Sequence, residues 1–407
     1  MPGIGGDGRG AWGRGLLVGL LLLLGLGARP AHAGQPHPLA LLPREKLLGL
    51  APLLRSTDLV LLESDAKGGM NQITIMSLVA APPRVMHDVI TQPERYGEFV
   101  RNMTQSSVKK LPDGSLEHTY LFDYGIFDAM GVHRIVMHAG DPGPVELFDA
   151  ASYGDGIRHF RWEFLPAAGG TLVVQYGYIE LSRSGGLVEQ LRSRLPTLDF
   201  GMGMVGQLTQ VLAMKGRAEQ LAGAPPPLPA PGGADYSFLL DRGVVALLRS
   251  QGGRLSELTL IDRSTAPPEA LLRAAQNVEG WPSYVQSIKS SAAVGTRDQM
   301  QIFDLVQALP LLTFATRFGV RSTATSVDLA GLSGDLVGAR MRFDVRRDAQ
   351  GRSQIVYRSA HNFERASFAL RQLYRLEPLF DHGINVGLAL LIQRGVRGYA
   401  ERTAAAR

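Results

Sequence analysis

Apolar and polar residues alternate along most of the chain, in short segments that end at clusters of glycine, proline or aspartate. Such alternation is typical of antiparallel strands with one face on a core, and the turn residues separate one strand from the next. The pattern predicts strands over residues 59–63, 72–79, 103–110, 115–124, 133–138, 145–151, 158–165 and 171–182. After residue 234 it predicts a second set, over residues 244–249, 255–262, 300–306, 313–327, 339–346 and 353–362.

Helical periodicity occupies corresponding places in the two sets. Long helices are predicted from Pro196 to residue 221 and from Pro378 to residue 400, since proline is tolerated in a first helical turn. Shorter helices are predicted directly after the double prolines Pro82-Pro83 and Pro267-Pro268, at which a strand ends. The chain therefore predicts an α+β protein in which one order of elements occurs twice.

Matching landmarks in the two sets keep an offset between 180 and 185 residues, which predicts a duplicated domain rather than a solenoid of short repeats. They are Pro82-Pro83 with Pro267-Pro268, Phe122-Asp123 with Phe303-Asp304, Gly154-Asp155 with Gly334-Asp335, and Pro196, Asp199 and Gly201 with Pro378, Asp381 and Gly383. Residues 222–234 are almost entirely alanine, proline and glycine, a composition that cannot build a core. We therefore predict a domain over residues 39–221, a linker over 222–234, and a second domain over 235–403.

The repeated order is a strand hairpin, two short helices carrying an aromatic pair, an antiparallel meander and a long C-terminal helix. The aromatic pairs are Tyr96 with Phe99 and Trp281 with Tyr284. This order resembles the START-like or SRPBCC superfamily, and within it the coenzyme Q-binding and polyketide cyclase-like branch. The resemblance covers nearly all of the chain after residue 38, once in each half.

The resemblance implies two tandem helix-grip domains, each a curved antiparallel sheet wrapped around its long C-terminal helix with an apolar cavity between them. Members of the superfamily bind or carry sterols, phospholipids, quinones or polyketides, and a minority catalyse reactions on them. In the second half, one strand between residues 327 and 335 is expected to be short or missing, and the second cavity correspondingly smaller.

Aromatic and methionine side chains are the candidates for lining these cavities. Alternation places Phe160, Trp162 and Phe164 on one face of a strand, and Tyr176 and Tyr178 on one face of the next. Methionine adapts to irregular ligands. The concave face also forms the core, so core packing is the alternative role for each residue. The full set is Phe122, Phe160, Trp162, Phe164, Tyr176, Tyr178, Met202, Met204, Phe303, Phe314, Phe318 and Phe343.

The sequence predicts no catalytic residue, metal site or cofactor, and leaves enzyme activity open. The absence of cysteine excludes disulfides and thiolate metal sites, and no two of His118, His133, His138 and His159 have a metal-ligand spacing. Residues 201–206 match G-x-G-x-x-G, but no strand leads into them, so we interpret the glycines as close helix–sheet packing. Asp199 and Asp381, near helix starts, are expected to be structural.

Residues 1–33 have the features of a signal peptide. An apolar run over residues 16–26, too short to span a bilayer, precedes the A-x-A site Ala31-His32-Ala33. We expect cleavage after Ala33 and export, most simply to a bacterial periplasm; an uncleaved anchor is the alternative. Cleavage removes three arginines and one aspartate, so the net charge falls from +5 to about +3.

The remaining positive charge does not indicate nucleic-acid binding, because the arginines are scattered and no basic run is interleaved with aromatics. A transient contact with anionic lipid headgroups fits such a charge. A solvated basic surface is the alternative, and the more common one.

Our leading hypothesis is an exported protein that holds or transfers a lipid, sterol or quinone. A polyketide cyclase or dehydratase is the first alternative; it requires a polar pair inside one cavity, with Arg, Tyr or Asp facing in. An envelope scaffold or partner-binding module with collapsed cavities is the second. A single merged fold, or two interiors without room for a hydrocarbon, would count against the leading hypothesis.

Overall fold

The computed structural model describes residues 37–123, 128–149, 158–179, 198–223, 233–309, 312–360, 371 and 380–406. The predicted signal segment, residues 1–33, and most of the predicted linker lie outside these residues. The side chain of Met202 is likewise outside the description. Within the described part, no helix is both long and apolar enough to cross a membrane.

The first half begins with two short helices and continues with the predicted hairpin, short helices, meander and long helix. Its elements are α2 (Arg44–Leu48), α3 (Ala51–Leu54), β1 (Asp58–Ser64), β2 (Met70–Val79), α4 (Pro83–Thr91), η2 (Pro93–Glu98), β3 (Met103–Lys110), β4 (Leu116–Asp123), β5 (Asp128–Met137), β6 (Val145–Asp149), β7 (Arg158–Ala167), β8 (Gly170–Ile179) and α6 (Leu198–Ala222).

The second half repeats this order. Its elements are β9 (Val244–Gln251), β10 (Arg254–Ser264), α7 (Pro268–Gln276), η4 (Val278–Ser283), β11 (Ile288–Arg297), β12 (Met300–Leu309), β13 (Leu312–Ser322), β14 (Ser326–Gly334), β15 (Arg340–Arg347), β16 (Ser353–Ala360) and α9 (Phe380–Ala405). Both α4 and α7 start at the second proline of a double proline, as predicted. The prediction of a short or missing strand is wrong: β14 pairs with β13 and, over Ser326–Ala330, with β15, with a register shift between Gly331 and Ser333.

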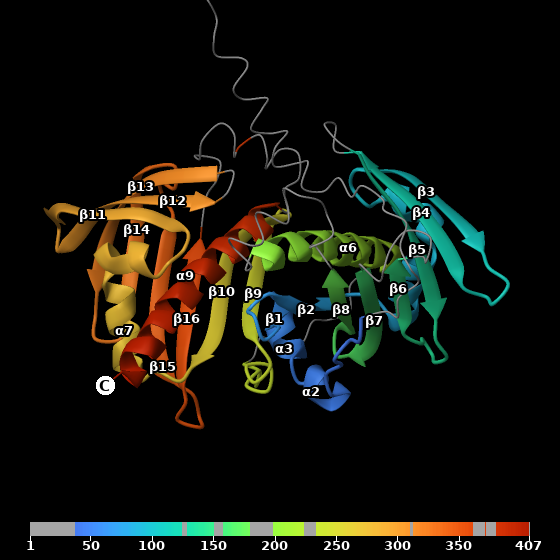
Figure 1. Cartoon of the computed structure of the whole chain (residues 1–407). Coiled ribbons are helices and arrows are strands. Elements are labelled where there is room, and N and C mark those ends of the chain that lie inside the picture. Colours follow the sequence, from blue (N-terminus) through green and yellow to red (C-terminus); the bar gives the residue numbers. More distant parts are fainter. Residues whose placement is uncertain are drawn as a thin grey trace, which may run out of the picture.

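The strands of both halves form one antiparallel sheet in the order β11-β12-β13-β14-β15-β16-β10-β9-β1-β2-β8-β7-β6-β5-β4-β3 (Figure 1). The expectation of two separate sheets is therefore wrong, because β1 pairs with β9. Residues Leu59–Leu62 are apolar and buried on both faces of β1. An exposed edge with such side chains would attract another strand, and here the first strand of the other half covers it.

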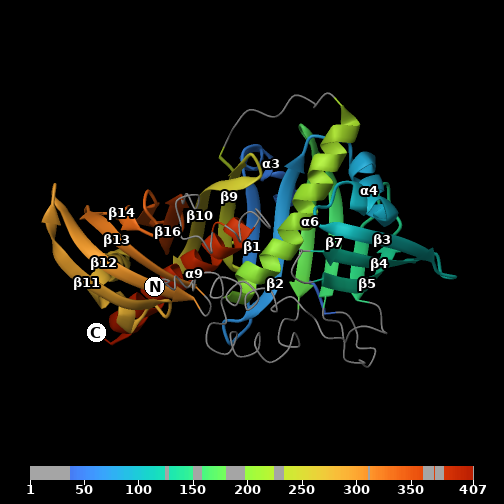
Figure 2. The same cartoon turned by 90° about the horizontal axis from the view of Figure 1, so that it is seen from above.

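A local two-fold axis relates the halves and passes through the pair Val60–Ala246, which are cross-strand partners at matching positions of β1 and β9. The helices α6 and α9 meet near the same axis (Figure 2). A Cβ atom on Gly201 would lie 2.6 Å from the carbonyl oxygen of Gly383, and one on Gly383 would lie 2.7 Å from that of Gly201. Glycine recurs at this repeated position because the two backbones touch there.

The predicted role of glycine in helix–sheet packing holds for Gly203. A Cβ atom there would lie 2.9 Å from the sulfur of Met70 on β2. Helix α6 lies against β2 and β8, while α9 lies against β10 and β16. Buried apolar side chains on this face of the sheet and on the helices α4, α6, α7 and α9 form one continuous core cluster.

The opposite face of the sheet carries a second, smaller core near the junction of the halves. Leu47, Leu50 and Leu54 of the N-terminal helices pack there, together with Leu239 and Leu240 from the segment before β9. The sheet centre is thus covered on both sides, and its outer strands are covered mainly on the helix-bearing side.

Candidate functional site

A row of polar side chains crosses four neighbouring strands on the helix-bearing face of the first half. His118 on β4 is the cross-strand partner of His133 on β5, which is the partner of Asp149 on β6. Arg158, at the start of β7, places its Nε atom 3.4 Å from Oδ1 of Asp149. The same face carries Ile135, Leu147 and Phe160, which belong to the main core. We call His118, His133, Asp149 and Arg158 the polar row.

The polar row is buried. His118 and His133 are 1% and 3% exposed, and the side chains of Asp149 and Arg158 are 4% and 19% exposed. Four such residues in the interior are unusual, because a buried charge or imidazole loses its hydration.

Tyr120 lies beside the row, with its hydroxyl accepting a hydrogen bond from Nη1 of Arg158. Gly131 is its partner on β5, and a Cβ atom at that position would come within 2.5 Å of the tyrosine oxygen. Glycine at position 131 thus leaves the space that the Tyr120 side chain occupies.

The imidazole of His133 lies near both Tyr120 and Asp149. Its ring centroid is 4.7 Å from that of Tyr120, and its Nε2 atom is 3.7 Å from Oδ1 of Asp149. At the far end of the row, Nε2 of His118 is 2.8 Å from Oγ of Ser106. The row and Tyr120 therefore form one contiguous polar cluster.

Burial decides the charge states of the row. It lowers the pKa of His118 to about 4 and lowers the pKa of His133 well below its ordinary value. Burial also raises the pKa of Asp149, against the opposing effect of Arg158. For Arg158, burial disfavours the charge, but Tyr120 and Asp149 outweigh it and the pKa is raised. The two imidazoles are therefore neutral at neutral pH, beside the Asp149–Arg158 pair.

Each member of the polar row has a polar atom without a hydrogen-bond partner among the described residues: Nδ1 of His118, Nε2 of His133, Oδ2 of Asp149 and Nε of Arg158. An unsatisfied buried polar group costs about 1–3 kcal/mol. Such groups are normally satisfied by a bound polar group or by water. Residues 124–127, 150–157 and 180–197, which adjoin these strands in sequence, lie outside the described part.

More unpartnered groups lie along the same face. The indole Nε1 of Trp162 and both amide atoms of Gln175 and Gln207 have no hydrogen-bond partner within the described ranges. Trp162 and Gln175 are cross-strand partners on β7 and β8, and Gln207 of α6 occupies the space over Gly177. The polar character of this face therefore extends from the row toward α6.

The structure places most of the sequence-predicted cavity residues on the helix-bearing face. Phe160, Trp162, Phe164 and Met204 are buried in the main core, and Phe122 is half-buried against it. The second-half residues Phe303, Phe314, Phe318 and Phe343 are buried in the same core. Contact of these residues with a ligand stays a prediction.

Tyr176 and Tyr178 were placed on the wrong face. The partner of Phe160 on β8 is Gly177, so its neighbours Tyr176 and Tyr178 point to the opposite side of the sheet. There the hydroxyl of Tyr176 accepts a hydrogen bond from the backbone N–H of Leu42, and Tyr178 stacks on His37. A ligand between the sheet and α6 would not contact either tyrosine.

Sequence reasoning did not predict the polar row, because it weighed His118 and His133 one by one, as metal ligands or as surface or hydrogen-bonded histidines. Among the described residues no group of three His, Cys, Asp or Glu side chains is arranged to hold a metal ion. The available signal was a comparison of the two halves, which the sequence offsets misaligned at this point by matching Phe122 to Phe303.

Cross-strand partners, followed outward from the Val60–Ala246 axis, give the correct correspondence. Each step goes from a residue to its cross-strand partner on the next strand of the same half. In the first half the steps pass through β2, β8, β7, β6, β5 and β4. In the second half they pass through β10, β16, β15, β14, β13 and β12. His118, Tyr120, His133, Asp149 and Arg158 correspond to Phe303, Leu305, Phe318, Gly331 and Ala339. The second half is apolar at every position of the cluster.

The arrangement of elements also bears on the family. Both halves contain the hairpin, the two short helices, the meander and the long final helix, in the order that the resemblance required. Each half has the element order of a START-like domain. No family model matches the chain, and neither does any curated protein.

Solved structures similar to this chain include proteins with one and with two such domains. The di-domain ARO/CYC StfQ from the steffimycin biosynthetic pathway is 12% identical, with 82% of this chain and 99% of that chain covered and a TM-score of 0.31. The STAR-related lipid transfer protein from Xanthomonas axonopodis is 11% identical, with 39% and 93% covered and a TM-score of 0.27.

Proposed function

We propose that the first half binds an amphiphilic small molecule with an apolar body and a neutral polar end. The apolar body lies between the sheet and α6, beside Phe160, Trp162 and Met204. The polar end meets the polar row. A lipid, sterol or quinone has this build, and holding or transferring such a ligand is the function we assign to the protein.

The polar row carries this proposal. The duplicated fold supplies its own control, because the second half folds with Phe303, Phe318, Gly331 and Ala339 at the same positions. Apolar groups in place of a buried ion pair are often neutral or favourable for stability. A row that the fold does not require, and that stability does not favour, is best explained by a bound polar group.

The chemistry of the row favours a neutral ligand group. The charge of Arg158 is largely matched by Asp149, and a neutral imidazole offers one N–H donor and one acceptor nitrogen. A hydroxyl or carbonyl oxygen can satisfy such groups, as a sterol hydroxyl or a quinone carbonyl would. A ligand whose polar end carries a full charge fits less well.

The merging of the two sheets leaves this site intact. The junction runs along β1 and β9, and β2 and β8 lie between it and the strands that carry the row. A merged fold was expected to count against binding; the proposal stands on the first half keeping its own long helix and its own face of the sheet for the ligand.

Export, cleavage after Ala33 and a transient contact with anionic membrane surfaces are part of the same proposal. They rest on the apolar run over residues 16–26, the A-x-A site and the residual positive charge. A carrier in the periplasm would have access to lipids of the membranes on either side of that compartment.

Native mass spectrometry of the full chain, after incubation with a bacterial lipid extract, tests the binding. We expect wild type to retain a bound apolar molecule through desalting. The double variant Asp149→Gly/Arg158→Ala introduces the second-half residues and should lose it. Tyr178→Leu, on the opposite face, should retain it. A wild-type protein that never retains ligand, or a double variant that retains it equally, would contradict the proposal.

A second candidate function is proton-transfer catalysis on a polyketide-like substrate. The observation that favours it is the Tyr120 hydroxyl, bonded to Arg158 and next to the neutral imidazole of His133. A phenol and a neutral imidazole can donate and accept a proton, respectively. Conversion of a poly-β-ketone thioester by wild type but not by Tyr120→Phe would support this candidate, while tight binding of an unreacted ligand would favour the carrier.

A further inference from the structure

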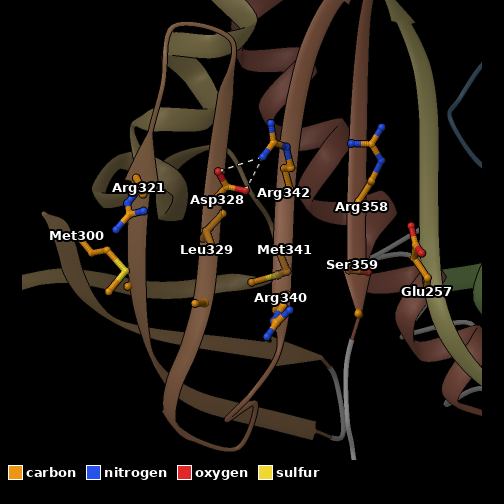
Figure 3. A pocket seen from close by; sticks show the side chains of 13 residues that line it. Glu257, Met300, Arg321, Asp328, Leu329, Arg340, Met341, Arg342, Arg358 and Ser359 are labelled. Atoms are coloured by element: carbon orange, nitrogen blue, oxygen red, sulfur yellow. Dashed lines mark hydrogen bonds and ion pairs between the residues drawn. The ribbon is translucent and has the colours of Figure 1, made fainter. Parts of the chain in front are cut away.

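A pocket of about 460 Å³ opens on the outer face of the second half, on the side of the sheet away from the helices. Its walls are four arginines, Arg321, Arg340, Arg342 and Arg358, on the strands β13, β15 and β16 (Figure 3). The small residues Gly319, Ala330 and Ala360 form its floor, and this is why a hollow exists on an otherwise flat sheet.

The charge of this arginine pocket is only partly neutralised. Arg342 pairs with Asp328 at 3.2 Å and with Asp344 at 2.8 Å, and Arg358 also pairs with Asp344. Within the described residues Arg340 has no ion-pair partner. Arg321 donates one long hydrogen bond, 3.4 Å to the carbonyl oxygen of Asp298. Two cations therefore face the hollow without a carboxylate of their own.

The matching surface of the first half is covered by an extended segment of the chain itself. Residues 37–42, which we call the strap, have neither helical nor strand structure. Gln72 accepts from the N–H of Ala40 at 2.8 Å and donates to the carbonyl of Ala40 at 3.1 Å. Nδ1 of His159 lies 2.6 Å from the carbonyl oxygen of His37.

Two further first-half residues hold the strap. The ring of Tyr178 stacks on that of His37 with centroids 3.7 Å apart, and the hydroxyl of Tyr176 accepts from the N–H of Leu42 at 3.1 Å. Most of these contacts go to the backbone of the strap, so this surface binds an extended peptide through its main chain.

The cross-strand correspondence that relates the polar row to its second-half positions also relates these four residues to the arginine pocket. Gln72, His159, Tyr176 and Tyr178 correspond to Glu257, Arg340, Arg358 and Ala360, and all four of these line the pocket. The pocket therefore stands where the strap lies in the other half.

We propose that the arginine pocket is a docking site for an extended, acidic peptide segment of a partner protein. The strap shows that this face of the duplicated fold accepts a peptide, and the unmatched Arg321 and Arg340 set the charge of its occupant. Residues 222–234 and the strap contain no acidic residue, so these two segments of the chain do not supply that charge.

Selection from a library of random peptides displayed on phage, with the full-length protein as target, tests this proposal. We expect peptides rich in Asp and Glu to be enriched. Those peptides, made synthetically and labelled with a fluorophore, should bind the double variant Arg321→Glu/Arg340→Glu about tenfold or more weakly. Hydrogen exchange should report protection of β13, β15 and β16 on binding.

Lys109→Glu/Lys110→Glu is the matched control, because it makes the same charge change on exposed residues of the first half. It should bind the peptides as wild type does. Circular dichroism and the native mass spectrum with lipid extract should be unchanged in both variants, which separates this test from that of the polar row. Failure to enrich acidic peptides, or equal binding by both variants, overturns the proposal. Saturable binding of inorganic phosphate or of phosphatidylglycerol vesicles in place of peptides also overturns it.

Discussion

The two halves of this protein share one fold and differ most where the first half buries His118, His133, Asp149 and Arg158. At the same positions the second half has Phe303, Phe318, Gly331 and Ala339. Both sets face the same continuous core and the same kind of long helix. Since one set is apolar and folds equally into the sheet, the polar set is not a requirement of the architecture. The difference marks the half that has kept, or gained, a site.

On the face of the sheet away from α6 and α9, it is the second half that presents an open polar surface. In the first half the strap covers the surface that Gln72, His159, Tyr176 and Tyr178 form. In the second half the corresponding surface is open and basic. Each half thus presents one polar site, on opposite sides of the same sheet, which is how a duplicated domain can divide two tasks between its copies.

The largest difference between the halves is expected in the free energy of unfolding that is lost when an ion pair is broken. Arg158→Met leaves the buried Asp149 without its cation and should lower the free energy of unfolding by about 3–5 kcal/mol. Arg342→Met removes two pairs, in which Arg342 is 45% exposed and Asp328 and Asp344 are 40% and 21% exposed, and should cost about 1 kcal/mol or less for each pair. Urea unfolding at neutral pH measures both.

The double variant Asp149→Gly/Arg158→Ala is the control for this comparison, because it removes both charges together. It should recover part of the stability that Arg158→Met loses, because no unpaired charge stays buried, while the space left by the smaller side chains keeps some of the loss. If Arg158→Met costs no more than Arg342→Met, the first-half pair is not buried as described and the contrast between the halves is lost.

The pH dependence that His118 gives to the first half is the next largest effect. The pKa of His118 is about 4 in the folded state, against about 6.5 in an unfolded chain. Above pH 6.5 the imidazole is neutral in both states. As the pH falls from about 6.5 to about 4, only the unfolded state binds the proton, so up to about 3 kcal/mol of stability is lost. His133 acts in the same direction.

His118→Phe, which places the second-half residue at this position, should remove the His118 part of that slope. The measurement is the free energy of unfolding of wild type and variant at several pH values between 7 and 4, and the difference between the two curves isolates one imidazole. Parallel curves would mean that His118 is hydrated in the folded protein.

Sequence reasoning predicted most elements and their duplication, because alternation and helical periodicity are local signals, but it missed β11 (Ile288–Arg297). Phe160, Trp162 and Phe164 share a buried face as the period of two required. Strand β14 was expected to be short or missing. At Gly331 and Gly334 a Cβ atom would come within 2.0 and 2.2 Å of backbone oxygens, so the glycines serve close backbone packing.

The same reasoning could not predict which residues are cross-strand partners, because strand register is not a local property of the sequence. The face of Tyr176 depends on the register of β8 against β7, and the polar row depends on the registers of four strands joined by loops. The merged sheet did leave a local signal, because the apolar run Leu59–Leu62 is typical of a strand buried on both faces. Read in that way, it would have indicated a second strand beside β1.

The smallest of the three effects tests the symmetry on which the comparison depends. Gly201→Ala and Gly383→Ala each place a methyl group against the backbone of the opposite helix, at 2.6 and 2.7 Å from a carbonyl oxygen. Each should lower the free energy of unfolding by about 1–3 kcal/mol, since forced contacts in packed regions cost that much.

Gly206→Ala is the matched control in the same helix, because no atom lies within 4 Å of the added methyl group. It should raise stability by about 0.5–1 kcal/mol through helix propensity alone. Without a helix crossing at the axis, Gly201→Ala and Gly383→Ala would gain stability as Gly206→Ala does. Equal losses at both positions, against a gain at Gly206, would mean that the two helices meet at equivalent residues. The halves would then be related by a two-fold axis. The polar row of the first half and the apolar residues Phe303, Phe318, Gly331 and Ala339 of the second half would occupy equivalent positions.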